Sequence, residues 1–127
     1  MRFLSLALPA LLLAPAVATA APRPVPAATP NGKAERCVPL SQIRESRVRS
    51  DQVIDFYLRD GRILRNTLPN SCPQLGFEQR FAYGTSLNQL CSVDIITVLQ
   101  VPGAVRGASC GLGEFQPVAI TDPKQRR

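Results

Sequence analysis

The chain has 127 residues, 45% of them hydrophobic and 19% charged, with 15 Lys and Arg against 9 Asp and Glu, so that its formal net charge is +6. It contains no histidine, the side chain most often used for acid-base catalysis at neutral pH, and its glycines match neither a dinucleotide nor a P-loop fingerprint. We therefore expect no cofactor, no metal and no catalytic residue of the usual types.

The N-terminal stretch has the layout of a secretory signal. Met1-Arg2 supplies a positive charge, and an uncharged run rich in Leu and Ala follows as far as Val17. Ala18-Thr19-Ala20 then places small residues where signal peptidase requires them. This predicts a signal peptide over residues 1–20 and a periplasmic or secreted protein. An uncleaved anchor is the alternative, but the run is shorter than the roughly 20 residues that cross a bilayer, and no later segment is hydrophobic enough for a membrane span.

Composition divides the rest of the chain into three parts. Residues 21–36 hold four prolines and little that can pack, which predicts a disordered linker rich in Pro and Ala. Residues 37–122 should form the single folded domain, and residues 123–127 a basic tail. Within the domain eight basic residues balance eight acidic ones, so the excess charge is assigned to the linker and the tail. We expect no nucleic-acid partner, because the domain itself lacks a basic excess.

One basic cluster lies inside the domain, at Arg44, Arg47 and Arg49. Arginines spaced in this way are typical of a solvated strand face. We interpret the cluster in that sense and assign it no ligand.

Four cysteines, Cys37, Cys72, Cys91 and Cys110, make an even count in a chain with an export signal, which predicts two disulfides. A tetrathiolate zinc site is the alternative, but it usually takes its ligands from close CxxC pairs, and none is present. The expected strand order places Cys37 and Cys72 at opposite ends of a meander. Of the two connectivities that remain, we prefer the nested one, Cys37 with Cys110 and Cys72 with Cys91.

The clearest secondary structure lies between residues 52 and 68, where two β-rich runs flank Asp60-Gly61. Asp-Gly in this setting favours a two-residue hairpin loop, because both central residues of a type I′ turn have positive φ. Such a loop places Asp55 opposite Asn66. A strand over about residues 43–49 should precede this hairpin and complete a three-stranded meander.

Further short strands are expected in the second half of the domain. Residues 81–86 alternate as a strand, and residues 86–90 suit a helical turn. Residues 93–99 are β-branched and apolar, as in a strand buried on both faces. Residues 114–120 should form an edge strand, because Pro117 cannot donate to a ladder. The fold class is therefore mainly β, a small single-domain barrel or sandwich of five to six short antiparallel strands with two disulfides.

A set of short motifs is spread over the whole domain. The motifs are Arg47-Val48, Asp51-Gln52, Ile54-Asp55-Phe56, Arg59-Asp60-Gly61-Arg62, Arg65-Asn66-Thr67-Leu68-Pro69, Cys72-Pro73, Leu75, Leu90-Cys91, Asp94-Ile95-Ile96-Thr97-Val98-Leu99, Cys110-Gly111-Leu112-Gly113, Phe115 and Pro117. Together they resemble a family of small exported proteins of Gram-negative bacteria, a domain family of unknown function. The resemblance implies an exported single domain with the cysteines in its pattern, and it implies no activity.

The leading functional hypothesis is a non-catalytic exported binding module that contacts an envelope protein or polymer. One alternative is a histidine-free hydrolase of envelope glycans that uses paired carboxylates. Asp94 is its candidate, because this carboxylate opens an apolar strand; the competing interpretation is a hydrogen-bonded structural aspartate. A second alternative is a carrier that holds a small ligand in its interior.

Overall fold

The computed structural model describes residues 9–16, 23–85 and 87–125. Most of the expected signal peptide, and the expected cleavage site after Ala20, lie outside these residues. No helix in the described part of the chain is long and apolar enough to cross a bilayer. The elements are β1 Ala28–Pro30, β2 Cys37–Pro39, η1 Leu40–Gln42, β3 Ile43–Val48, β4 Val53–Leu58, β5 Ile63–Thr67, α1 Leu75–Glu78, β6 Phe81–Tyr83, β7 Gln89–Cys91, β8 Ile95–Gln100, β9 Val105–Gly111, β10 Phe115–Ile120 and η2 Pro123–Gln125.

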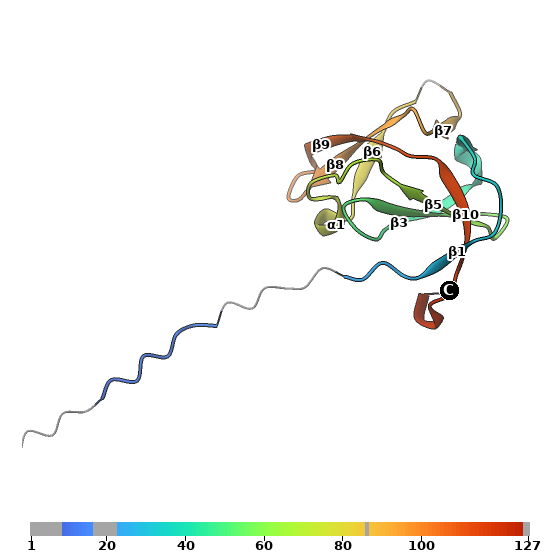
Figure 1. The fold of residues 1–127 in the computed structure, drawn as a ribbon. Coiled ribbons are helices and arrows are strands. Elements are labelled where there is room, and N and C mark those ends of the chain that lie inside the picture. Colours follow the sequence, from blue (N-terminus) through green and yellow to red (C-terminus); the bar gives the residue numbers. More distant parts are fainter. Residues whose placement is uncertain (1–8, 17–22, 86, 126–127) are drawn as a thin grey trace, which may run out of the picture.

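The strands form three antiparallel sheets. A five-stranded sheet has the order β1-β10-β5-β4-β3, a three-stranded sheet the order β6-β8-β9, and β2 pairs with β7. Figure 1 shows the three-stranded sheet lying over one face of the five-stranded sheet. The predicted mainly β class with two disulfides is confirmed. The described residues contain ten strands instead of five or six, and the sheets do not close into a barrel.

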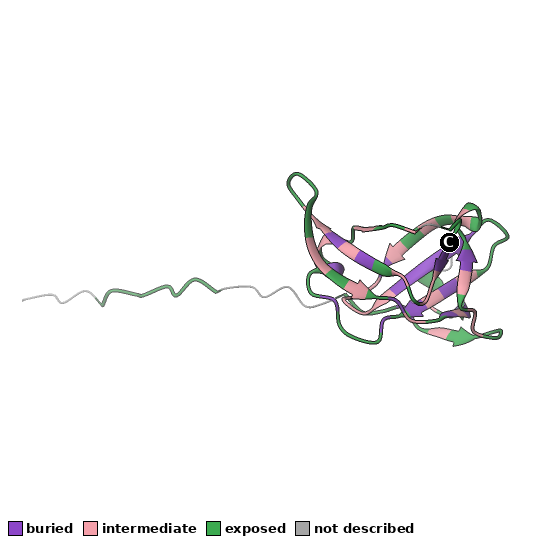
Figure 2. Cartoon of the chain, turned by 90° about the horizontal axis from the view of Figure 1, so that it is seen from above, coloured by how far each residue is buried: buried purple, intermediate pink, exposed green. Residues whose placement is uncertain are grey.

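The core lies between the two larger sheets. Phe56 on β4 makes edge contacts with Phe81 on β6 and Phe115 on β10, at centroid distances of 6.4 and 5.4 Å. Ile96 and Val98 point into the same layer from β8 and are fully buried. Buried positions follow the strands, whereas the β8–β9 hairpin projects with an exposed tip (Figure 2). The other face of the five-stranded sheet is therefore free to carry polar groups.

The predicted meander of β3, β4 and β5 is confirmed, but its hairpin register is wrong by one residue. The loop has three residues, because the Leu58 N–H donates to the Arg62 carbonyl and Gly61 alone has the positive φ, +91°. Asp55 consequently pairs with Arg65, and Asn66 with Ile54. A shift of one residue moves side chains to the other face of a sheet. Asp55 and Asn66, expected as partners, therefore lie on opposite faces.

The expected disordered linker contributes to the sheet. Residues 28–30 form β1, which pairs with β10, and Glu35 exchanges backbone hydrogen bonds with Phe115. The expectation of an edge strand at 114–120 was therefore wrong, since β10 lies between β1 and β5. Pro117 is tolerated because its carbonyl accepts a hydrogen bond of 3.0 Å from the Asn31 N–H, while the regular pairing that would need an N–H in return is interrupted between β1 and Glu35.

Two further expectations differ from the structure. Residues 89–91 are strand β7, not part of a helical turn, because they pair with β2. Strand β8 is buried on one face only: Ile96 is inaccessible, whereas Ile95 is 58% exposed. The prediction of a strand buried on both faces was therefore wrong, although β8 carries apolar residues on both faces.

The disulfides are Cys37–Cys91 and Cys72–Cys110, so the nested pairing was wrong. The pairing of β2 with β7 places Cys37 directly opposite Cys91. The second bond joins the loop before α1 to β9. Without β7, which the sequence did not indicate, the correct connectivity had no structural reason to be preferred.

Candidate functional site

Asp55 is a fully buried carboxylate on the outer face of the five-stranded sheet, the face turned away from the core. Arg65 on β5 binds it with two parallel hydrogen bonds, of 2.8 and 3.0 Å. Arg49, just after β3, donates to it from Nε at 2.9 Å. The side chains of Arg49 and Arg65 are only 10% and 15% exposed. One carboxylate thus fixes two guanidinium groups and leaves a net positive charge.

Tyr57 extends this arrangement along β4. Its hydroxyl accepts a hydrogen bond of 2.8 Å from Arg49, and its ring lies 4.3 Å from the Arg47 guanidinium carbon and 6.0 Å from that of Arg44. Glu45 lies within 2.9 Å of Arg47 and 3.5 Å of Arg44. Cation–π contact and ion pairing hold these arginines beside the ring. The three arginines expected on a solvated strand face are therefore built into a network.

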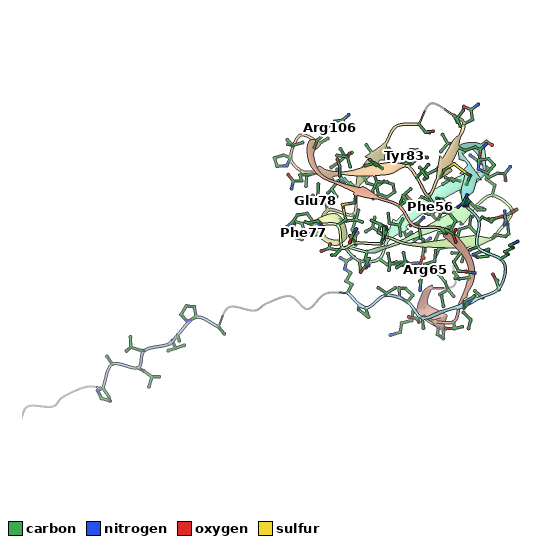
Figure 3. All side chains as sticks on the ribbon, turned by 45° about the horizontal axis from the view of Figure 1, so that its top comes forward. Phe56, Arg65, Phe77, Glu78, Tyr83 and Arg106 are labelled. Atoms are coloured by element: carbon green, nitrogen blue, oxygen red, sulfur yellow. A yellow bond between two sulfur atoms is a disulfide. The ribbon has the colours of Figure 1, made fainter. Side chains whose placement is uncertain are left out.

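The segments before β1 and after β10 meet on the same face. The Thr121 N–H donates to the Ala27 carbonyl at 2.9 Å, and Pro26 is buried. Figure 3 shows Arg65 on the side of the sheet where the C-terminal turn lies, and Phe56 on the opposite side. Arg23 of the expected linker and Lys124 of the expected tail therefore lie beside the arginine network.

A polar groove of about 620 Å³ opens where these segments meet. It is lined by Arg23, Pro24, Pro26, residues 46–49, Gln79, Asp122 and Lys124. We call the groove with the adjoining arginine network the basic pole. Its charged members are Arg23, Arg44, Arg47, Arg49, Arg65 and Lys124 with Glu45, Asp55 and Asp122, so six positive charges face three negative ones. Arg126 and Arg127 follow in sequence and lie outside the described residues.

The catalytic candidate Asp94 and two other carboxylates of the domain, Asp51 and Asp60, have structural partners. Asp94 accepts a hydrogen bond of 2.7 Å from the Cys91 backbone N–H, as expected of a structural aspartate beside an adjacent loop. Asp51 accepts one of 2.7 Å from Gly76. Asp60 accepts hydrogen bonds from the backbone N–H and from the side chain of Arg62. Both bonds lower the pKa of its carboxyl, and the backbone bond is the larger cause. The described residues include no group of three or more His, Cys, Asp or Glu side chains able to hold a metal ion.

The interior offers little support for a carrier. Large apolar side chains fill the space between the sheets, and the groove of the basic pole and a second groove both open at the surface. The second groove lies at the β4–β5 loop and β10, away from the arginine network. The basic pole is therefore the most developed site in the described part of the chain.

Sequence reasoning missed Asp55 as the centre of this site because the register error placed it opposite Asn66. Asn66 instead exchanges two hydrogen bonds with the Gly113 backbone, of 2.7 and 2.8 Å. One feature of the sequence could have indicated this ion pair. Asp55 lies within an apolar strand, and Arg65 lies on the following strand of the same hairpin.

Comparisons with models of protein families, with curated proteins and with solved structures each found no match.

Proposed function

We propose that this protein is an exported, non-catalytic binding module whose basic pole binds an anionic component of the cell envelope. The supporting observation is the convergence of Arg23 and Lys124, from the two ends of the described domain, on arginines that Asp55 holds in place. Guanidinium groups recognise phosphate and carboxylate groups through paired hydrogen bonds. The ligand chemistry that fits is therefore a phosphate or carboxylate group carried by an envelope component.

Pre-organisation supports this proposal. Holding a flexible arginine in one position costs conformational entropy, and here the fold has already met that cost through Asp55 and Tyr57. Arg47 and Arg49 have further interactions within the protein. Because these interactions hold the two side chains, their contribution to binding an anion is positive charge at a fixed position. Positive charge gathered on one face attracts an anionic surface at a distance as well as on contact.

An envelope location is supported by two independent features. The N-terminal sequence has the layout of a secretory signal. All four cysteines are paired in the structure, and disulfides persist in oxidising compartments.

A glycan hydrolase finds less support than a binding module. Asp94, its candidate residue, has its carboxylate engaged by the backbone of Cys91. General acid-base work needs a carboxyl group that is able to contact the substrate.

Binding to inorganic polyphosphate, a soluble polyanion, tests the proposal. Titration calorimetry on the oxidised protein should show binding that weakens as the Debye length falls from about 30 Å at 0.01 M salt to about 3 Å at 1 M. A basic side chain beside an anionic surface contributes about 1 kcal/mol, so the double variant Arg23→Gln, Lys124→Gln should lose about 30-fold in affinity.

The matched control is Lys33→Gln, Arg59→Gln, which removes the same two charges from exposed positions outside the basic pole. We expect this control to weaken binding only slightly. Equal losses in the two double variants, or binding that ignores salt, would refute a site at the basic pole.

A further inference from the structure

Phe77 is a large apolar side chain held in an exposed position. It lies on the short helix α1 and is 81% exposed (Figure 3). The helix is firmly attached: Leu75 is fully buried, the Gly76 N–H donates to Asp51 at 2.7 Å, and the preceding Cys72 is bonded to Cys110. The exposure of Phe77 is therefore imposed by the fold.

The tip of the β8–β9 hairpin lies next to α1. The Val101 N–H donates to the Glu78 carboxylate at 3.3 Å, and the Leu99 N–H to the Arg80 carbonyl at 3.0 Å. Val101 and Val105 are 51% and 58% exposed, and the hairpin projects from the body of the domain (Figure 2). We call Phe77, Val101 and Val105 the apolar tip.

Basic groups border the apolar tip. Arg80 and Arg106 are exposed and flank Leu99 of β8, since the Leu99 N–H donates to the Arg80 carbonyl and Arg106 pairs with Leu99. Two carboxylates nearby, Glu78 and Asp51, accept hydrogen bonds from the Val101 and Gly76 N–H groups. Gln79, at the end of α1, lines the groove of the basic pole. The apolar tip and the basic pole therefore adjoin at one end of the molecule.

Apolar side chains bordered by arginines suit the surface of an anionic bilayer. There the apolar groups enter the boundary between headgroups and acyl chains, while the arginines remain among the phosphates. A projecting tip buries little against a flat protein surface, whereas a headgroup layer yields around it. The charge and the shape of this end both favour a lipid surface as its partner.

We infer that the anionic component is a bilayer containing acidic phospholipid and that the apolar tip inserts into it, with Phe77 as the principal anchor. This inference rests on the proposed function, because the basic pole supplies the attraction to the anionic surface. It adds the lipid class and the side chain that enters the membrane.

The absence of tryptophan from the chain gives a direct test. The variant Phe77→Trp carries a single tryptophan at the proposed anchor. The oxidised variant is mixed with vesicles of phosphatidylcholine, with or without phosphatidylglycerol. With phosphatidylglycerol present, the emission should shift to the blue and should be quenched by lipids brominated on their acyl chains. The control Val93→Trp, an 85% exposed position at the opposite end of β8, should show neither change.

Binding measurements separate this inference from the proposed function. Phe77→Ala should weaken binding to phosphatidylglycerol vesicles about tenfold, the effect of withdrawing one aromatic side chain from the interface, while polyphosphate binding stays unchanged. Val93→Ala should alter neither. Vesicle binding without a response at position 77 would overturn the insertion and leave the proposed function standing, as would polyphosphate binding without vesicle binding. Failure to bind either probe would overturn both.

Discussion

Replacing Asp55 with alanine tests whether this carboxylate organises the outer face of the five-stranded sheet. The change removes three hydrogen bonds from Arg49 and Arg65 and leaves two guanidinium groups that are 10% and 15% exposed without their carboxylate. Removing one partner of a buried ion pair costs about 3–5 kcal/mol. Because both arginines keep some contact with water, we expect the lower end, about 3 kcal/mol.

Urea unfolding of the oxidised protein measures this loss. With a slope of about 2 kcal/mol per molar urea for a small domain, about 3 kcal/mol corresponds to a midpoint lower by about 1.5 M. The matched control is Asp60→Ala, which removes the carboxylate of another Asp–Arg pair in the same hairpin, where the side chains are 46% and 49% exposed. That variant should change the midpoint little. If the midpoints of the two variants fall equally, Asp55 is not the organising group that we describe.

Three further predictions concern other parts of the fold. Gly113→Ala should lower the melting temperature of the domain strongly, because a Cβ at this position would collide with the Thr67 carbonyl oxygen. Gly111→Ala is the control and should be tolerated, because a Cβ there meets nothing within 4 Å. Similar melting temperatures for the two variants would contradict this explanation. Limited reductant followed by peptide mapping should open Cys37–Cys91, whose two residues are half-buried, before Cys72–Cys110, whose Cys72 is inaccessible; the reverse order would show that accessibility does not control reduction. Carboxyl NMR should find the pKa of Asp60 below its usual value, and Arg62→Ala should raise it only part of the way, because the backbone N–H of residue 62 is the larger cause and remains. The stabilisation from this bond is therefore present at neutral pH and is lost as the pH falls through the lowered pKa; full recovery in the variant would show that the side chain dominates.

Local patterns in the sequence predicted the local structure well. The β-rich runs around Asp60-Gly61 gave the strands of the meander, and the cysteine count gave two disulfides. Non-local pairing decided the rest. Whether Arg59 belongs to the loop depends on small differences in turn energy, yet it determines whether Asp55 faces Asn66 or Arg65.

The basic pole could not be predicted because its parts are far apart in the chain. A segment rich in proline, such as residues 23–27, has the composition of a linker. It is ordered here because β1 pairs with β10 and Pro26 is covered, and neither event leaves a signal within the segment. Counting charges by segment therefore assigned to separate parts of the chain basic residues that the fold brings together on one surface.

Mapping the amide shifts of the oxidised, ¹⁵N-labelled protein during titration with inorganic polyphosphate tests the central claim most directly. We expect the changes to gather at Arg23, residues 46–49, Gln79 and Lys124, which line one groove although they are distant in sequence. Changes gathered instead at the start of β8, around Val93 and Ile95, or no changes at all, would contradict a binding site at the basic pole.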